Sequence, residues 1–93
     1  MQYMQPKDPA EVLDYTLDWD AELGAGEEIS GTPVWTLPDG ITKDSQANTT
    51  TTATVWLSGG TAGVEYAIAC KITTNNSPAR THEKTIIVPV LQD

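Results

Sequence analysis

The sequence lacks most of the residues from which catalytic and metal-binding sites are built. Cys70 is the single cysteine, His82 is the single histidine, and phenylalanine is absent. A lone cysteine cannot form a disulfide within the chain, and one cysteine with one histidine is too few for a Cys/His metal cluster. Small secreted domains often carry disulfides, so this composition favours folding in a reducing cytoplasm. We expect no bound metal and no cofactor.

Positive charge and long apolar runs are also scarce. The 5 Lys and Arg residues stand against 13 Asp and Glu residues, which gives a formal net charge of -8. Phosphate groups are bound by clustered Lys and Arg, so we expect no nucleic acid and no anionic membrane among the partners. No apolar run approaches the roughly 20 residues that span a bilayer. Residues 1–4 lack the basic and apolar regions of a signal peptide.

Two patterns that could indicate an enzyme have simpler explanations. Cys70 and His82 fall on strands that we expect to pair as a hairpin, but Cys70 shares the apolar face of its strand, where an inert buried thiol is the common case. Residues 59–63 are rich in glycine, yet a phosphate-binding loop requires a following helix and here a strand follows. The glycines suit a turn instead. The sequence therefore predicts no catalytic residue and no enzyme.

What the sequence does contain is an alternation of apolar and polar residues, which indicates strands with one buried face. Residues 64–73 show it most clearly, with apolar side chains at every second position: Val64, Tyr66, Ile68, Cys70 and Ile72. Residues 14–22 repeat the pattern. Pro33 interrupts the next strand pattern, which predicts a strand that lies at an edge or carries a bulge. Residues 41–43 could begin a short strand, whereas the polar residues 44–48 resemble a loop.

About six or seven short strands, with turn signals about every ten residues and no convincing helix, predict an all-β fold. We expect an immunoglobulin-like antiparallel β-sandwich over residues 10–93. A glycine shortly before the strand-borne Tyr66 resembles the tyrosine corner of such sandwiches. The antibody disulfide framework is excluded, because Ile68 stands where its second cysteine would be.

Residues 1–9 are predicted to form an extended N-terminal arm, because Pro6 and Pro9 disfavour both a helix and a central strand. Tyr3 and Met4 could contact a neighbouring subunit. We expect the arm to become ordered only on assembly. Its removal should then leave the melting temperature of the monomer almost unchanged.

Acidic residues gather in the first third of the chain. Asp18, Asp20 and Glu22 lie on the polar face of the strand pattern in residues 14–22. Such a face is usually solvated, and the functional alternative is a docking surface for a partner. An EF-hand calcium loop is excluded, because the sequence lacks the glycine and the glutamate that its sixth and twelfth positions require.

Trp56 alternates with Val55 and Leu57, so either the tryptophan or its two neighbours face outward. The three tryptophans could form a platform for carbohydrate, although Trp19 and Trp35 have the parity of core residues. Six residues are our candidates for partner binding: Tyr3, Met4, Asp18, Asp20, Glu22 and Trp56.

Four segments, taken in order, resemble a family of small phage proteins. They are Lys7-Asp8-Pro9 and residues 13–19, 35–41 and 55–66. The combination is similar to phage fiber-tail adaptor proteins, which are encoded in the structural-gene regions of tailed bacteriophages and prophages. The likeness extends from about residue 7 to residue 90. It implies a non-enzymatic virion component with an immunoglobulin-like fold.

The same resemblance implies a role and a place for the protein. It would be present in several copies in the virion, bridge the tail or baseplate to the fibres, and be assembled in the cytoplasm of the host bacterium. Its partners would be other virion proteins, namely tail, baseplate or fibre subunits. Two other functions stay open at this point: a capsid decoration protein, and a carbohydrate- or cell-surface-binding module.

Overall fold

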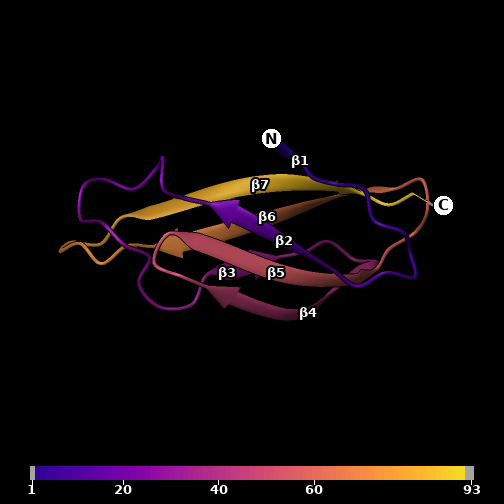
Figure 1. Cartoon of the computed structure of the whole chain (residues 1–93), viewed down its shortest axis with the longest axis horizontal. Coiled ribbons are helices and arrows are strands. Elements are labelled where there is room, and N and C mark those ends of the chain that lie inside the picture. The colour runs from indigo at the N-terminus through magenta and orange to yellow at the C-terminus, as the bar shows by residue number, and fades with distance from the viewer. Residues whose placement is uncertain (1, 92–93) are drawn as a thin grey trace.

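Seven β-strands follow one another along the part of the chain that the computed structural model describes, residues 2–91 (Figure 1). Their bounds are β1 (Gln2–Tyr3), β2 (Leu13–Asp18), β3 (Val34–Thr36), β4 (Ile41–Asn48), β5 (Thr52–Gly59), β6 (Glu65–Thr73) and β7 (Thr81–Pro89). Within the described residues there is no helix. Residue 1 of the expected arm and residues 92 and 93 of the expected domain lie outside the described residues.

The strands form two sheets that lie one on the other as two layers (Figure 1). One sheet has the order β1-β7-β6-β3, and the other has the order β2-β5-β4. All neighbours are antiparallel except β1 and β7, which are parallel. β3 is an edge strand of its sheet, which confirms the prediction made from Pro33.

The core lies between the two sheets and receives alternate side chains of the long strands β5 and β6. β5 contributes Ala53, Val55 and Leu57, and β6 contributes Ile68, Cys70 and Ile72. The predicted all-β sandwich is therefore confirmed. The orders β2-β5-β4 and β3-β6-β7 are compatible with the B-E-D and C-F-G orders of immunoglobulin sandwiches. The more specific immunoglobulin-like assignment stays a prediction.

The glycine-rich segment joins β5 in one sheet to β6 in the other, so it closes the sandwich at one end. Gly60 has a φ of +96°, and a Cβ atom there would lie 2.7 Å from Cγ2 of Val90, so the turn requires glycine. The Thr61 N–H donates to the Tyr66 hydroxyl at 2.9 Å. A backbone group a few residues upstream of the tyrosine is the partner that the tyrosine-corner comparison predicts.

β4 differs from the sequence-based prediction. The loop predicted over residues 44–48 is wrong, because these residues continue the strand to Asn48 and pair with β5. Most side chains of β4 are exposed, since the strand lies at the edge of its sheet. With few buried positions to select apolar residues, the alternation that identifies a strand is missing. A register shift between Lys43 and Ser45 interrupts the pattern further.

The N-terminal arm packs against its own sandwich. The Met4 N–H donates to the Ile87 carbonyl at 2.8 Å, and the Lys7 N–H donates to the Pro89 carbonyl at 3.0 Å. The expectation that the arm becomes ordered only on assembly is therefore wrong. Pro6 permits this packing, because the hydrogen bonds to β7 use the amides of the residues around it.

The molecule is elongated, with extents of 45 × 21 × 18 Å. We call one tip the arm end: it comprises residues 5–12, the β5–β6 turn at residues 60–64 and residue 91 (Figure 1). We call the other tip the hairpin end: it comprises the β2–β3 loop at residues 19–33 and the β6–β7 loop at residues 74–80. Each end brings together segments that are distant in the sequence.

Candidate functional site

The six candidate residues do not form one site. Tyr3 and Met4 lie on the arm along β7, and the three acidic residues lie at or beside the hairpin end. Trp56 is on the outer face of the β2-β5-β4 sheet. The structure therefore offers three separate surfaces.

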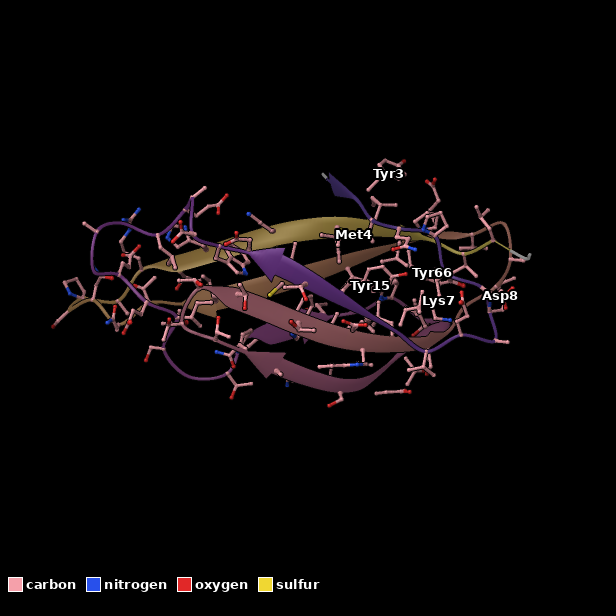
Figure 2. The ribbon with its side chains drawn as sticks, in the orientation of Figure 1. Tyr3, Met4, Lys7, Asp8, Tyr15 and Tyr66 are labelled. Carbon is pink, nitrogen blue, oxygen red and sulfur yellow. The ribbon has the colours of Figure 1, made fainter. Side chains whose placement is uncertain are left out.

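Tyr3 and Met4 point in opposite directions from the arm (Figure 2). The Tyr3 side chain is directed outward and is 63% exposed, and its hydroxyl donates to Oε1 of Glu65 at 3.2 Å. This hydrogen bond to a carboxylate raises the pKa of Tyr3. Met4 is partly buried and packs against the core. Of the two, only Tyr3 presents most of its side chain to a partner.

Lys7 is the most unexpected residue of the arm, because its side chain is fully buried. Its ammonium group donates to the carbonyls of Asp8 and Gly59, each at 2.8 Å. The sequence predicts an exposed side chain for a lysine between two prolines, because lysine is almost never fully buried. The sequence-based reasoning therefore gave Lys7 no structural role. Figure 2 shows it at the arm end.

Tyr15 also binds the arm. The Tyr15 side chain lies mostly within the core, and its hydroxyl donates to the Gln5 carbonyl at 2.9 Å. Burial raises the pKa of Tyr15 to about 12, and the nearby negative charges of Glu11 and Asp14 act in the same direction. The hydroxyl therefore keeps its proton, and with it this hydrogen bond, through the neutral range.

Two of the three acidic residues contact a lysine from the opposite sheet. The Lys84 ammonium group lies 2.9 Å from Oε1 of Glu22 and donates to the Asp18 carbonyl at 3.2 Å. The same group lies 4.9 Å from the centre of the Trp19 ring, a cation–π contact. Glu22 is thus partly neutralised, whereas the side chains of Asp18 and Asp20 are exposed. These two carboxylates are the part of the acidic face that a partner can reach.

A second buried charge lies at the hairpin end and was also missed by the sequence-based reasoning. The Glu27 side chain is 2% exposed, and its Oε1 accepts the Gly24 N–H at 3.0 Å. Its carboxylate lies 3.6 Å from Nη1 of Arg80 and 3.9 Å from Nε2 of His82. Glu27 therefore joins the β2–β3 loop to the start of β7.

Trp56 faces outward, which answers the question that its alternation left open. Its neighbours Val55 and Leu57 are fully buried, while the tryptophan is half-buried. Across the sheet it pairs with Asp14 on β2 and Ser45 on β4, both exposed. The result is a flat polar face with one large aromatic side chain near its middle.

Cys70 and His82 do not form a nucleophile pair. Although β6 and β7 are hairpin partners, Cys70 is paired with Lys84, and His82 is paired with Ile72. Cys70 is fully buried, and this burial raises the pKa of its thiol to about 12, opposed in part by the influence of the Trp19 side chain. The His82 ring is instead near Glu27. The thiol is therefore protonated and unreactive at neutral pH.

Over residues 2–91, no group of three or more His, Cys, Asp and Glu side chains is placed to hold a metal ion. In the same part of the chain, no helix is long and apolar enough to cross a membrane.

Comparison with known protein families identifies the chain. The family model described as podophage GP4 fiber-tail adaptor protein gp77 matches residues 7–89. The chain belongs to this family. The protein is thus a structural component of a phage virion, as the resemblance implied. No curated protein and no solved structure matched the chain.

The family match includes six of the seven strands found in residues 2–91. It begins at the buried Lys7 and ends with Pro89, the last residue of β7, so β2 to β7 lie within it. β1 precedes the match, and with it the candidate residues Tyr3 and Met4. The acidic candidates and Trp56 lie inside the matched region.

Proposed function

We propose that this protein is a non-enzymatic adaptor that bridges the tail or baseplate of the virion to its fibres. The observation that carries the proposal is the family match over residues 7–89. In this proposal, several copies are present in each particle, and they are assembled in the cytoplasm of the host bacterium. The partners are tail, baseplate or fibre subunits.

The shape of the molecule supports a bridging role. An adaptor needs separate surfaces for its two neighbours, and the arm end and the hairpin end lie at opposite tips of a body 45 Å long (Figure 1). The hairpin end carries the exposed carboxylates of Asp18 and Asp20. With a net charge of -8, the chain favours a neighbour with a basic surface. We assign the hairpin end to that neighbour.

Virions that carry substituted variants of the protein test this assignment. We expect Asp18→Asn with Asp20→Asn to lower the number of fibres per particle, measured by quantitative mass spectrometry, because two charges facing the basic neighbour are lost. Asp39→Asn is the matched control, since Asp39 is an exposed carboxylate in the β3–β4 turn, away from the hairpin end. Equal fibre numbers in the two variants would remove the hairpin end from the proposal.

A cryo-electron microscopy map of the native virion tests the bridging role itself. The expected result is density for the sandwich at the junction of tail and fibres, in contact with both. Density on the capsid surface would support the decoration alternative and would contradict the adaptor role. A map of this kind would also give the copy number.

The outward position of Trp56 favours a second candidate function, a carbohydrate- or cell-surface-binding module. An aromatic ring flanked by Asp14 and Ser45 has the apolar face and polar neighbours that sugars use. We expect glycan-array binding that is lost in Trp56→Ala and kept in Thr54→Ala, a change on the same face of β5. An array without signal would count against this function and leave the adaptor role untouched.

A further inference from the structure

The arm packs into a site on the rest of the molecule, which we call the seat. The seat consists of the residues that bond the arm: Tyr15, Gly59, Ile87, Pro89 and Leu91. Backbone hydrogen bonds join Met4 to Ile87 and Lys7 to Pro89, and the Leu91 N–H returns a third bond to the Lys7 carbonyl at 2.9 Å. Side chains add the bonds from Tyr15 to the Gln5 carbonyl and from Lys7 to Gly59. Residues 3–7 thus behave as an edge strand with a buried anchor.

An empty seat would be costly. Without the arm, the carbonyls of Ile87, Pro89 and Gly59 and the mostly buried hydroxyl of Tyr15 would lose these partners. Polar groups that the arm covers and that lose their partners destabilise the folded chain. The core would also lose its contact with Met4. A folded chain therefore needs an arm in the seat, but these contacts do not require that the arm belong to the same chain.

The connection between the arm and β2 is short and can be opened. Residues 8–11 form a turn held by local hydrogen bonds: the Glu11 N–H donates to the Asp8 carbonyl at 3.0 Å, the Ala10 N–H donates to Oδ1 of Asp8 at 2.8 Å, and the Asp8 N–H donates to Oε1 of Glu11 at 2.8 Å. Ala10, Glu11 and Val12 are exposed. Fully extended, residues 8–12 reach about 16 Å.

Exposed apolar side chains gather beside this connection. Among the residues that the structure describes, the exposed large hydrophobic side chains are Tyr3, Val12, Val34, Val64 and Leu91. Apart from Val34, each lies on the arm or at the arm end: Leu91 bonds the Lys7 carbonyl, the Val64 carbonyl accepts the Val90 N–H, and Val12 ends the connection. A second molecule placed at the arm end would cover these side chains.

We infer that the arm is exchanged between copies of this chain, so that residues 3–7 of one copy fill the seat on β7 of the next. The exchanged form keeps the contacts within the seat, opens the turn at residues 8–11 and covers the apolar residues of the arm end. Exchange of an identical element is a low-cost route to association, because the contacts already exist in the closed monomer. The inference needs only two copies of this chain, so it does not depend on the adaptor role.

Disulfide trapping between two separately labelled chains tests the exchange. One chain carries Tyr3→Cys and is labelled with nitrogen-15; the other is unlabelled and carries Ile87→Cys. These positions are Cα partners in the β1–β7 register, within reach of a disulfide. The native Cys70 is kept, because it is fully buried. The chains are mixed near 1 mM, incubated and oxidised while folded.

The expected result is a labelled–unlabelled dimer at about ten times the yield of the control pair, because only exchange brings the partner positions together. The control pairs Tyr3→Cys with Thr81→Cys, on the same strand and with the same parity but six residues away from Ile87. Equal yields from the two pairs would overturn the inference. A single chain carrying both Tyr3→Cys and Ile87→Cys must close its own disulfide when dilute, and failure to do so would overturn it too.

A change in the turn gives a second measurement with no added cysteine. Glu11→Ala removes the acceptor of the Asp8 N–H, so the turn opens more readily. We expect the dimer fraction of the otherwise unaltered chain, measured by light scattering, to rise about fivefold, the factor that corresponds to one hydrogen bond. Asp14→Ala, an exposed acidic residue just beyond the turn, should leave it unchanged. No rise in Glu11→Ala would contradict the exchange.

Discussion

The two ends of the sandwich are each closed by one buried charged side chain, and the two charges have opposite signs. At the arm end, Lys7 is fully buried and donates to backbone carbonyls. At the hairpin end, Glu27 accepts a backbone N–H and lies near two cationic or potentially cationic side chains, Arg80 and His82. Each residue joins segments far apart in the sequence.

The comparison also shows a difference in how each charge is compensated. Lys7 is surrounded by fixed backbone dipoles, which no single side-chain substitution removes. Glu27 relies partly on two side chains, one of which, Arg80, is 59% exposed. Substituting Lys7 should therefore lower the free energy of unfolding more than substituting Glu27 does.

Lys7→Met gives the largest expected effect. The substitution preserves most of the volume but leaves the Gly59 carbonyl without the lysine donor, which should cost about 2–3 kcal/mol. For a domain of this size, that corresponds to a fall of roughly 10–20 °C in melting temperature, measured by circular dichroism. Lys71→Met, an exposed lysine on β6, is the control and should change the melting temperature by less than about 3 °C. Similar values for the two variants would show that the arm contributes little stability.

Alkaline pH should give the next largest fall in melting temperature. It acts through the thiol of Cys70, which lies in the core between the two ends. The folded chain holds the Cys70 proton up to a pKa of about 12, whereas the unfolded chain releases it near 9. The unfolded state thus binds fewer protons in this range, so stability is complete below pH 9 and falls as pH rises toward 12. We expect the melting temperature at pH 11 to be lower by on the order of 10 °C.

Cys70→Ala separates this effect from general repulsion in an acidic chain. In the variant, the fall in melting temperature that begins near pH 9 should disappear. The fall that begins near pH 10 should remain, because the pKa of Tyr15 is raised to about 12 in the folded chain and its ionisation also favours the unfolded state. An unchanged pH profile in the variant would assign the whole effect to other groups.

Glu27→Gln tests the hairpin end. The amide oxygen can still accept the Gly24 N–H, but the negative charge facing Arg80 and His82 is lost. We expect a loss of about 1–2 kcal/mol, measured by urea denaturation. Glu28→Gln, its exposed neighbour, should lie within about 0.5 kcal/mol of the unaltered protein. A loss in Glu27→Gln larger than that in Lys7→Met would reverse the ranking of the two ends.

Tyr3→Phe should have the smallest effect. It removes one exposed hydrogen bond to Glu65 and keeps the ring in place. The melting temperature should change by less than about 2 °C, because exposed polar contacts contribute little net stability. A larger change would mean that Tyr3 supports the arm in the monomer as Lys7 does.

The elements that the sequence predicts well are those with one buried face. Val55 and Leu57 on β5, and Ile68 and Ile72 on β6, are all buried or nearly so, and it is their burial that selects apolar residues at every second position. The tyrosine-corner contact of Tyr66 was predictable for a different reason. It depends on a local turn, because the partner Thr61 lies only five residues before the tyrosine.

The elements that were missed depend on contacts between distant segments. Lys7 is buried because Gly59 supplies an acceptor from more than fifty residues away, and no local pattern encodes that meeting. Glu27 likewise meets Arg80 across two loops. The six candidate residues come from three segments with different local patterns, and only the folded structure shows where the surfaces that these segments form lie relative to one another.

The parallel pairing of β1 with β7 has a mechanical consequence. If the chain is pulled by its two ends, the force draws β1 and β7 past each other in opposite directions along their length. The bonds from Met4 to Ile87 and from Lys7 to Pro89 then carry the load together and must break together, instead of opening one at a time. A protein loaded in this shearing direction resists extension far better than one whose terminal strands peel apart.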